Sequence, residues 1–248
     1  MNNTKIPSKW DIPEKMRRRF GKNGVGKQRA MFAEEHLLII LHRAPNSESE
    51  GREAMIFWRN PQGKWKSSDG GNDIYKLRQH IEEFSTREIN LSDLYDKANS
   101  PENYFDLLEE LTPLVRSSQN MTNALQQARE YVEDQDIIDL RDRCQEVARE
   151  VEILNTDARY GLDYQVAKRA EEQARYSMQN LKSTDRLNVL VALFLPVTAI
   201  SGIFGMNLKI GLEEVPITVS WIIMIFSFLL GFAVKTWVIP SKKEKENC

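Results

Sequence analysis

Two long apolar blocks near the C-terminus constrain the fold of this chain more than any other feature. The first block, Leu187–Phe204, has 18 residues, which as a helix cover about 27 Å and so match the hydrocarbon thickness of a bilayer. The second block, Ile217–Ile239, is longer, and Trp221 and Trp237 stand near its ends, where amphipathic rings favour the headgroup layers. The sequence therefore predicts two transmembrane helices over residues 187–239, joined by a short loop over 205–216.

Positive charges predict the orientation of these two spans. The connecting loop has one lysine, Lys209, against Glu213 and Glu214, whereas both outer flanks are basic. The flanking basic residues are Lys182, Arg186, Lys235, Lys242, Lys243 and Lys245. By the positive-inside rule, both termini are cytoplasmic, including a lysine-rich tail over 240–248, and the loop is external. We therefore expect an integral, multi-pass protein of the plasma (inner) membrane, with the lipid bilayer as one partner.

The part of the chain that precedes the membrane is predicted to be α+β and mainly α-helical. Residues 1–30 are basic and indicate an irregular or partly helical segment. Residues 31–133 indicate a reduced α/β domain, in which "HLLIILH" (His36–His42) and "EAMIFWR" (Glu53–Arg59) are typical of strands in a small antiparallel sheet. Helical periodicity follows, with Ser100 and Pro101 as a cap and first-turn pair.

A proline-free segment over 134–186 predicts one long stalk helix that continues into the first membrane span. Its apolar residues recur with heptad spacing, and after a shift near Gly161 a second seam begins. The first seam is Leu140, Cys144, Val147, Val151, Leu154 and Ala158, and the second is Ala167, Ala174, Met178 and Leu181. Such a helix needs neighbours in the same chain or in other subunits. The alternative is a cytosolic helical bundle attached to a separate anchor.

Polar and small residues recur along one stripe of the first span. The stripe consists of Asn188, Val191, Leu195, Thr198, Gly202 and Gly205, which are spaced three or four residues apart. A polar entrance with a hydrophobic centre suits the wall of a narrow pore. Packing between helices through small residues explains the same stripe equally well. Because two spans cannot enclose a channel, a pore requires several copies around a symmetry axis.

The segment "FLPVTAISGIFGMN", followed by an acidic loop, a second span and a lysine-rich tail, closely resembles the CorA-type magnesium transporter family. The matching residues are Pro196, Thr198, Gly202, Phe204, Gly205, Met206 and Asn207. The resemblance implies a funnel-shaped homopentamer in which Gly205, Met206 and Asn207 form the selectivity filter at the outer mouth. It also implies that Thr198 and Gly202 line the next station, that Leu187, Val191 and Leu195 form a hydrophobic gate, and that the glutamates of the loop attract cations.

The same resemblance implies that Mg²⁺ is both the transported ion and a regulatory ligand at subunit interfaces. The dense acidic group on the stalk helix offers a candidate site, and a solvated helix face is the alternative explanation. This group consists of Asp134, Asp136, Asp139 and Asp142. The chain departs from many relatives in having Phe204 where tyrosine is common, and in placing its loop glutamates before the proline.

Other functions find little support in the sequence. The net charge of −2 gives no global basic field for nucleic acid. "GKNGVGKQ" resembles a phosphate-binding loop, but Gln28 replaces the required Ser or Thr, so no nucleotide is expected. No nucleophile–base pair indicates an enzyme. The remaining alternatives are a Zn²⁺, Co²⁺ or Ni²⁺ transporter of the same superfamily and a non-conducting, membrane-tethered coiled-coil scaffold.

Overall fold

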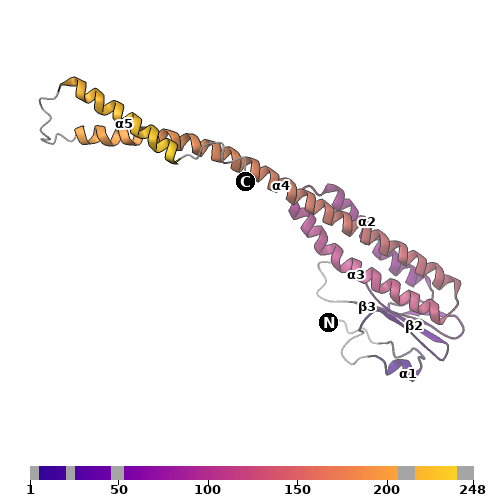
Figure 1. Cartoon of the computed structure of the whole chain (residues 1–248). Helices are drawn as coiled ribbons and strands as arrows, with labels where there is room; N and C mark the ends of the chain where they lie inside the picture. Colours follow the sequence, from indigo (N-terminus) through magenta and orange to yellow (C-terminus); the bar gives the residue numbers. More distant parts are fainter. Residues whose placement is uncertain (1–5, 21–25, 46–52, 206–215, 239–248) are drawn as a thin grey trace. The chain divides into compact units, whose positions relative to one another are not determined.

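The computed structural model describes residues 6–20, 26–45, 53–205 and 216–238 (Figure 1). The chain forms two compact units, Met1–Ala167 and Lys168–Cys248. The described part is mainly helical, with a small sheet and one long helix that belongs to both units. Its elements are α1 (Glu14–Arg17), β1 (Arg29–Ala33), β2 (His36–His42), β3 (Ala54–Arg59), β4 (Trp65–Ser67), α2 (Tyr75–Lys97), α3 (Pro101–Tyr131), α4 (Gln135–Gly205) and α5 (Ile217–Val238).

The sheet is antiparallel and has the strand order β1-β2-β3-β4. The two predicted strands are confirmed, with β3 beginning one residue later than expected. Strand β1 was missed, because Arg29 and Ala30 were assigned to the irregular segment over 1–30. A tight turn joins β1 to β2 through Glu34 and Glu35, whose φ angles are 53° and 59°. Such turns favour Asn and Gly, so two glutamates at these positions do not indicate a hairpin.

Both faces of the sheet are buried, which explains why β2 consists of a continuous apolar run. The helices cover one face, where Leu37, Ile39 and Phe57 join the main core. The N-terminal segment covers the other face, where Trp10 and Met16 pack with residues of the strands in a second core. Trp10 stacks on Trp58 of β3 with 5.6 Å between the ring centroids.

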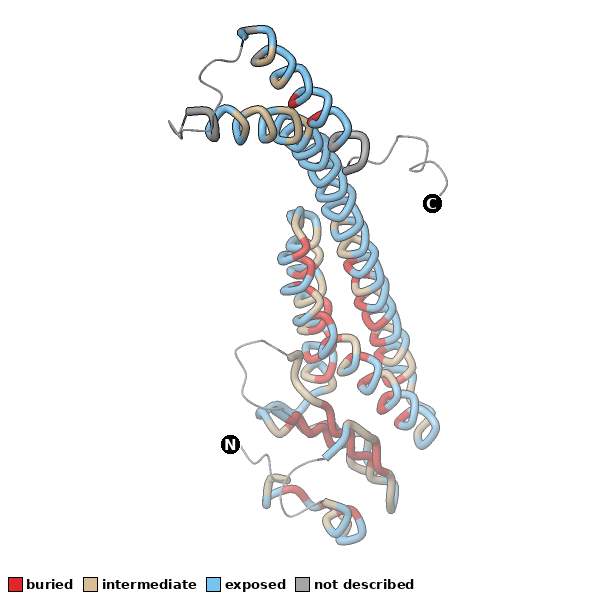
Figure 2. Tube along the Cα trace, turned by 60° about the vertical axis from the view of Figure 1, so that its left-hand side comes forward, coloured by how far each residue is buried: buried red, intermediate tan, exposed pale blue. Residues whose placement is uncertain are grey.

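The first half of α4 packs within the chain. All six residues of the first heptad seam are at most 6% exposed, and they share the main core with α2 and α3. Figure 2 shows buried residues gathered in the sheet and along the facing sides of these helices. Helix α3 begins as predicted, with the Ser100 hydroxyl accepting a hydrogen bond from the backbone N–H of Asn103.

The second half of α4 differs sharply. It continues without a break through Pro196 to Gly205, as the stalk prediction requires. Every residue over 166–188 is exposed, including the second seam, in which Met178 is 65% and Leu181 63% exposed. Within the part of the chain that the structure describes, the first seam is therefore covered and the second is not.

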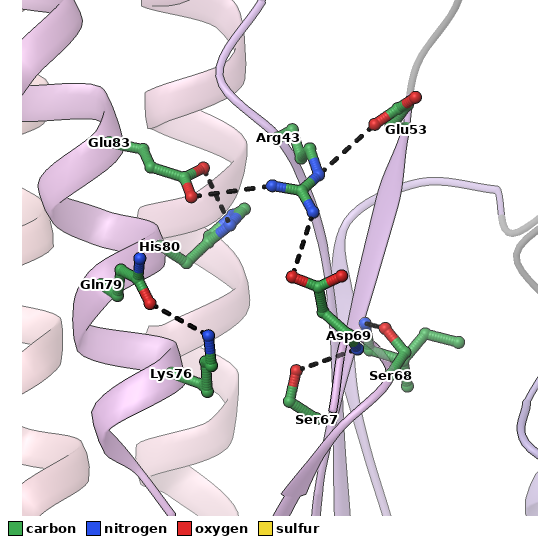
Figure 3. Close-up of polar contacts among 10 residues, drawn as sticks. Arg43, Glu53, Ser67, Ser68, Asp69, Lys76, Gln79, His80 and Glu83 are labelled. Atoms are coloured by element: carbon green, nitrogen blue, oxygen red, sulfur yellow. Dashed lines mark hydrogen bonds and ion pairs between the residues drawn. The ribbon is translucent and has the colours of Figure 1, made fainter. Parts of the chain in front are cut away.

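A group of charged residues fastens α2 to the end of the sheet (Figure 3). The Arg43 guanidinium lies 3.4 Å from the Glu53 carboxylate, 3.3 Å from Asp69 and 3.6 Å from Glu83. Beside it, His80 is buried, and its Nδ1 lies 3.8 Å from Glu83. Burial, above all, lowers the pKa of His80 to about 4, so this histidine is neutral at physiological pH.

Candidate functional site

The predicted pore-lining residues of the first span share an uncovered side of α4. The aliphatic members, Leu187, Val191 and Leu195, are 59%, 49% and 63% exposed. Asn188, Thr198 and Gly202 are exposed as well. We refer to these residues as the predicted pore stripe: Leu187, Asn188, Val191, Leu195, Thr198 and Gly202.

A different side of α4 packs against α5. The helices approach each other closely at Gly231, where an added Cβ would lie 3.0 Å from the carbonyl oxygen of Ala192 and 3.2 Å from Cα of Leu193. Ser227, one turn earlier on α5, is 2% exposed, and its hydroxyl donates to the Ile223 carbonyl at 2.7 Å. At 100° per residue, the mean direction of the predicted pore stripe lies roughly 140° around α4 from Ala192 and Leu193. Contact with α5 therefore leaves the stripe free to face another partner.

The polar members of the predicted pore stripe have groups available for hydrogen bonding. The Thr198 hydroxyl donates to the Phe194 carbonyl at 2.7 Å, so its proton is engaged while its oxygen keeps lone pairs that can accept. At Gly202, an added Cβ would meet no atom within 4 Å. The stripe thus combines a hydroxyl oxygen that can accept hydrogen bonds, an unobstructed backbone position and an aliphatic centre.

Seven-residue steps connect the stripe to the second seam of the stalk. Asn188, Leu195 and Gly202 continue the spacing of Ala167, Ala174 and Leu181. A second line with the same period contains Ser177, Thr184, Val191 and Thr198, which are also exposed. Ser177 and Thr184 were not among the residues predicted from the sequence. Counting back from Thr198 in steps of seven residues identifies both as members of this line.

The acidic group predicted as a regulatory metal site does not converge within one chain. Asp134 pairs with Arg59 of β3 at 3.0 Å, Asp142 lies 2.9 Å from Arg141, and Asp139 accepts from Gln135. Asp136 uses its backbone N–H to bond Asp134. Among the described residues, no group of three or more His, Cys, Asp or Glu side chains could hold a metal ion. A site between copies of the chain stays a prediction.

The predicted filter and loop lie largely outside the described residues. Gly205 is the last residue of α4, whereas Met206, Asn207, Glu213 and Glu214 are not described. The predicted second span corresponds to α5. Within the described part, α4 contains a stretch long and apolar enough to cross a membrane, and α5 contains a shorter apolar stretch over Trp221–Ala233.

Gln28, which ends the segment that resembles a phosphate-binding loop, has a structural contact. Its side-chain amide donates to the carbonyl oxygen and hydroxyl of Ser117 on α3, at 3.0 and 3.2 Å. This side chain fastens the start of β1 to the helices.

Comparisons with known proteins point to one family. A family model described as "CorA-like Mg2+ transporter protein" matches residues 73–243, which is more than half of the chain. Among solved structures, the chain is similar to the CorA magnesium transporter from Methanocaldococcus jannaschii, at 15% identity and a TM-score of 0.44, covering 86% of this chain and 78% of that one. It is also similar to the full-length CmaX protein, at 15% identity and a TM-score of 0.41, covering 82% and 76%. No curated protein matches the sequence.

Proposed function

Because this chain belongs to the CorA-like Mg²⁺ transporter family, whose members transport divalent cations across membranes, we propose that it conducts Mg²⁺ through a pore built from several copies of α4. The observation that carries this proposal is the position of the predicted pore stripe. All its members are exposed, and they lie away from the side that contacts α5. Polar residues in a membrane span are expected to face other helices or water.

Assembly follows from the small number of spans. Two helices in each copy cannot surround an aqueous path, whereas a ring of identical subunits can, and cyclic symmetry is the ordinary solution. The family resemblance implies a pentamer. In such a ring α4 faces the axis, and α5 lies outside it in contact with lipid.

Capture of the ion is assigned to Asn207, with Gly205 and Met206 shaping the outer mouth. Mg²⁺ dehydrates reluctantly and usually keeps several of its waters. A ring of carboxamide oxygens can accept hydrogen bonds from those waters without removing them. Glu213 and Glu214 raise the local cation concentration by their charge.

Passage through the membrane needs no nucleotide. An inward-negative potential of 100 mV contributes about 4.6 kcal/mol for a divalent ion that crosses the whole membrane. Along the way, the Thr198 hydroxyl oxygens and the open position at Gly202 accommodate water around the ion. The rings of Leu195, Val191 and Leu187 then form a hydrophobic constriction, which can gate a pore by excluding water.

Flux into liposomes that contain a Mg²⁺-sensitive dye tests this function. We expect Asn207→Ala to lower Mg²⁺ uptake by at least about tenfold, since loss of the outer ring removes the group that holds the hydrated ion. Thr198→Val removes a stripe hydroxyl, and Ser227→Ala is the matched control, because its hydroxyl is buried on α5.

Three outcomes separate the alternatives. Reduced uptake in the Asn207 and Thr198 variants, with normal uptake in the Ser227 variant, supports the pore. Uptake of Zn²⁺, Co²⁺ or Ni²⁺ in preference to Mg²⁺ would change the assigned ion. Absence of any conductance in the folded, reconstituted protein would refute transport and favour the scaffold.

A further inference from the structure

Charge is unevenly distributed along the chain before the membrane. Residues 1–30 carry nine basic and two acidic residues, whereas residues 75–167 carry twenty acidic and ten basic residues. The net charge of the whole chain, −2, hides this separation. Strong fields of opposite sign in one unit steer association and select partners.

The part of the basic region that ends with α1 lies on one face of the sheet, and the acidic helices lie on the other. Trp10, Ile12 and Met16 anchor the basic segment to one face through the second core. The helices cover the other face through the main core. Figure 1 shows α1 and α3 on opposite sides of the strands, so the sheet separates the charges of α1 from those of the helices.

The basic side carries an excess of positive charge. We define the basic face as the exposed side chains Lys15, Arg18, Arg19 and Lys27. Glu14 pairs with Arg18 at 3.2 Å, and this pair is exposed. Burial and then the charge of Arg19 lower the pKa of Arg29, so two guanidinium groups repel each other here.

The acidic side carries the opposite charge. Helices α2 and α4 run in the same direction, since Glu82 meets Arg143 and Glu88 lies beside Glu150. Burial and then Glu150 raise the pKa of Glu88. We define the acidic strip along these helices as Glu88, Asp96, Glu150 and Asp157, none of which forms an ion pair with another described residue.

We propose that the basic face of one copy docks on the acidic strip of the neighbouring copy. This inference rests on the proposed self-assembly and specifies the surfaces that meet outside the membrane. A contact between two different surfaces is heterologous, and it generates a closed ring when the rotation between subunits closes. Docking relieves the repulsion within both surfaces, because each arginine or lysine gains carboxylates as neighbours and each carboxylate gains cations.

Charge reversal tests the contact in the full-length protein. The first variant combines Arg18→Glu and Arg19→Glu, the second combines Glu88→Lys and Glu150→Lys, and a third carries all four changes. Controls are Arg129→Glu and Glu109→Lys, which reverse exposed charges on α3. The number of subunits per particle is measured by mass photometry in nanodiscs and detergent, across protein concentrations and at 50 and 500 mM NaCl.

At 50 mM NaCl we expect each double reversal to raise the midpoint concentration for dissociation by about tenfold, because attraction becomes repulsion. The difference shrinks at 500 mM NaCl because salt screens exposed charges. The four-residue variant recovers most of the wild-type association, whereas the controls behave as wild type. In wild-type protein, we expect a carbodiimide reagent to join Lys15 or Lys27 of one copy to Glu88 or Glu150 of another. Mixing isotope-labelled with unlabelled protein before the reaction distinguishes cross-links between copies from those within one copy.

Several results would overturn the inference. An assembly that is unchanged in both double reversals, or that the four-residue variant fails to restore, refutes this contact and leaves the proposed pore intact. Reversals that weaken only sedimentation with anionic vesicles would assign the basic face to lipid headgroups. Loss of association on chelating divalent cations, with no cross-links to lysine, would assign the acidic strip to a metal ion. A wild-type protein that is monomeric in nanodiscs refutes the inference and the proposed pore together.

Discussion

Acid should destabilise the part of the protein that contains the sheet, through one buried histidine. The His80 ring packs edge-on against Phe57 and Phe84, with 5.7 Å between ring centroids in each pair, and its pKa is about 4 instead of the ordinary 6.5. The unfolded chain therefore binds a proton more readily than the folded one, so stability is complete above pH 6.5 and falls as the pH drops toward 4. Between pH 7.5 and pH 5 the loss amounts to about 2 kcal/mol, which corresponds to about 4–8 °C in the unfolding midpoint.

Glu83 acts in the opposite direction, since its pKa is raised chiefly by burial and protonation of its carboxyl favours the folded state. Its effect is smaller, because its side chain is 36% exposed.

The measurement is tryptophan fluorescence of the full-length protein in nanodiscs, heated at pH values between 5 and 7.5. We expect His80→Leu to remove most of the acid-dependent fall in the midpoint. Phe84→Leu is the matched control: it truncates a neighbouring core side chain without removing a titratable group, so it lowers the midpoint similarly at every pH. If His80→Leu keeps the full pH dependence of the wild type, the buried neutral imidazole is not its cause, and the reasoning fails.

Four further variants test the packing of the helices and of the sheet. Gly231→Ala places a methyl group against a carbonyl oxygen of α4 and is expected to cost about 1–3 kcal/mol, read as a lower thermal midpoint in nanodiscs. The methyl group of Gly202→Ala meets no atom within one chain, and alanine favours a helix over glycine by about 1 kcal/mol. This variant should therefore keep its thermal stability while lowering Mg²⁺ flux. Normal flux would argue against placing Gly202 on the pore wall. Gly161→Ala would put a methyl group 2.7 Å from Cζ of Tyr104, at a cost of about 1–3 kcal/mol, and adding Tyr104→Ala should remove the extra penalty in a double-mutant cycle. Gln28→Ala is expected to lower the free energy of unfolding by about 1 kcal/mol, because the hydrogen bonds to Ser117 are lost. Transport is expected to be independent of ATP in this variant and in the wild type. ATP-dependent flux in the wild type would contradict our interpretation that this segment binds no nucleotide.

The sequence predicted best those elements whose residues repeat with a clear period. The strand over His36–His42, the cap at Ser100 and the unbroken helix α4 all agree with the structure. Each rests on a local rule: a continuous apolar run, a hydroxyl before a proline, or a heptad repeat without helix breakers. Local rules apply whatever the rest of the chain does, so they remain valid in the folded protein.

Elements that depend on tertiary contacts were not predicted. Strand β1 has only five residues, and its turn places two glutamates in a conformation they rarely adopt. The N-terminal segment reads as irregular, yet Trp10 and Met16 bury themselves on the sheet. Nothing in the local pattern of residues 1–30 reveals that a sheet face is available to them. For the same reason, the sequence left open whether the first heptad seam packs within the chain or between copies.

The uncovered half of α4 carries the argument for self-assembly one step further. Residues 166–188 are exposed throughout, and a helix without a packed face is marginal in water. Lipid cannot supply the missing cover, because this stretch contains charged residues such as Lys168, Glu171 and Arg175, which are costly in hydrocarbon. Its seven-residue period continues directly into the predicted pore stripe. A partner with the same period stays in contact over the whole length, and the described chain has one such helix, α4. Copies of α4 around a common axis would therefore cover the stalk and enclose the ion path with one continuous contact.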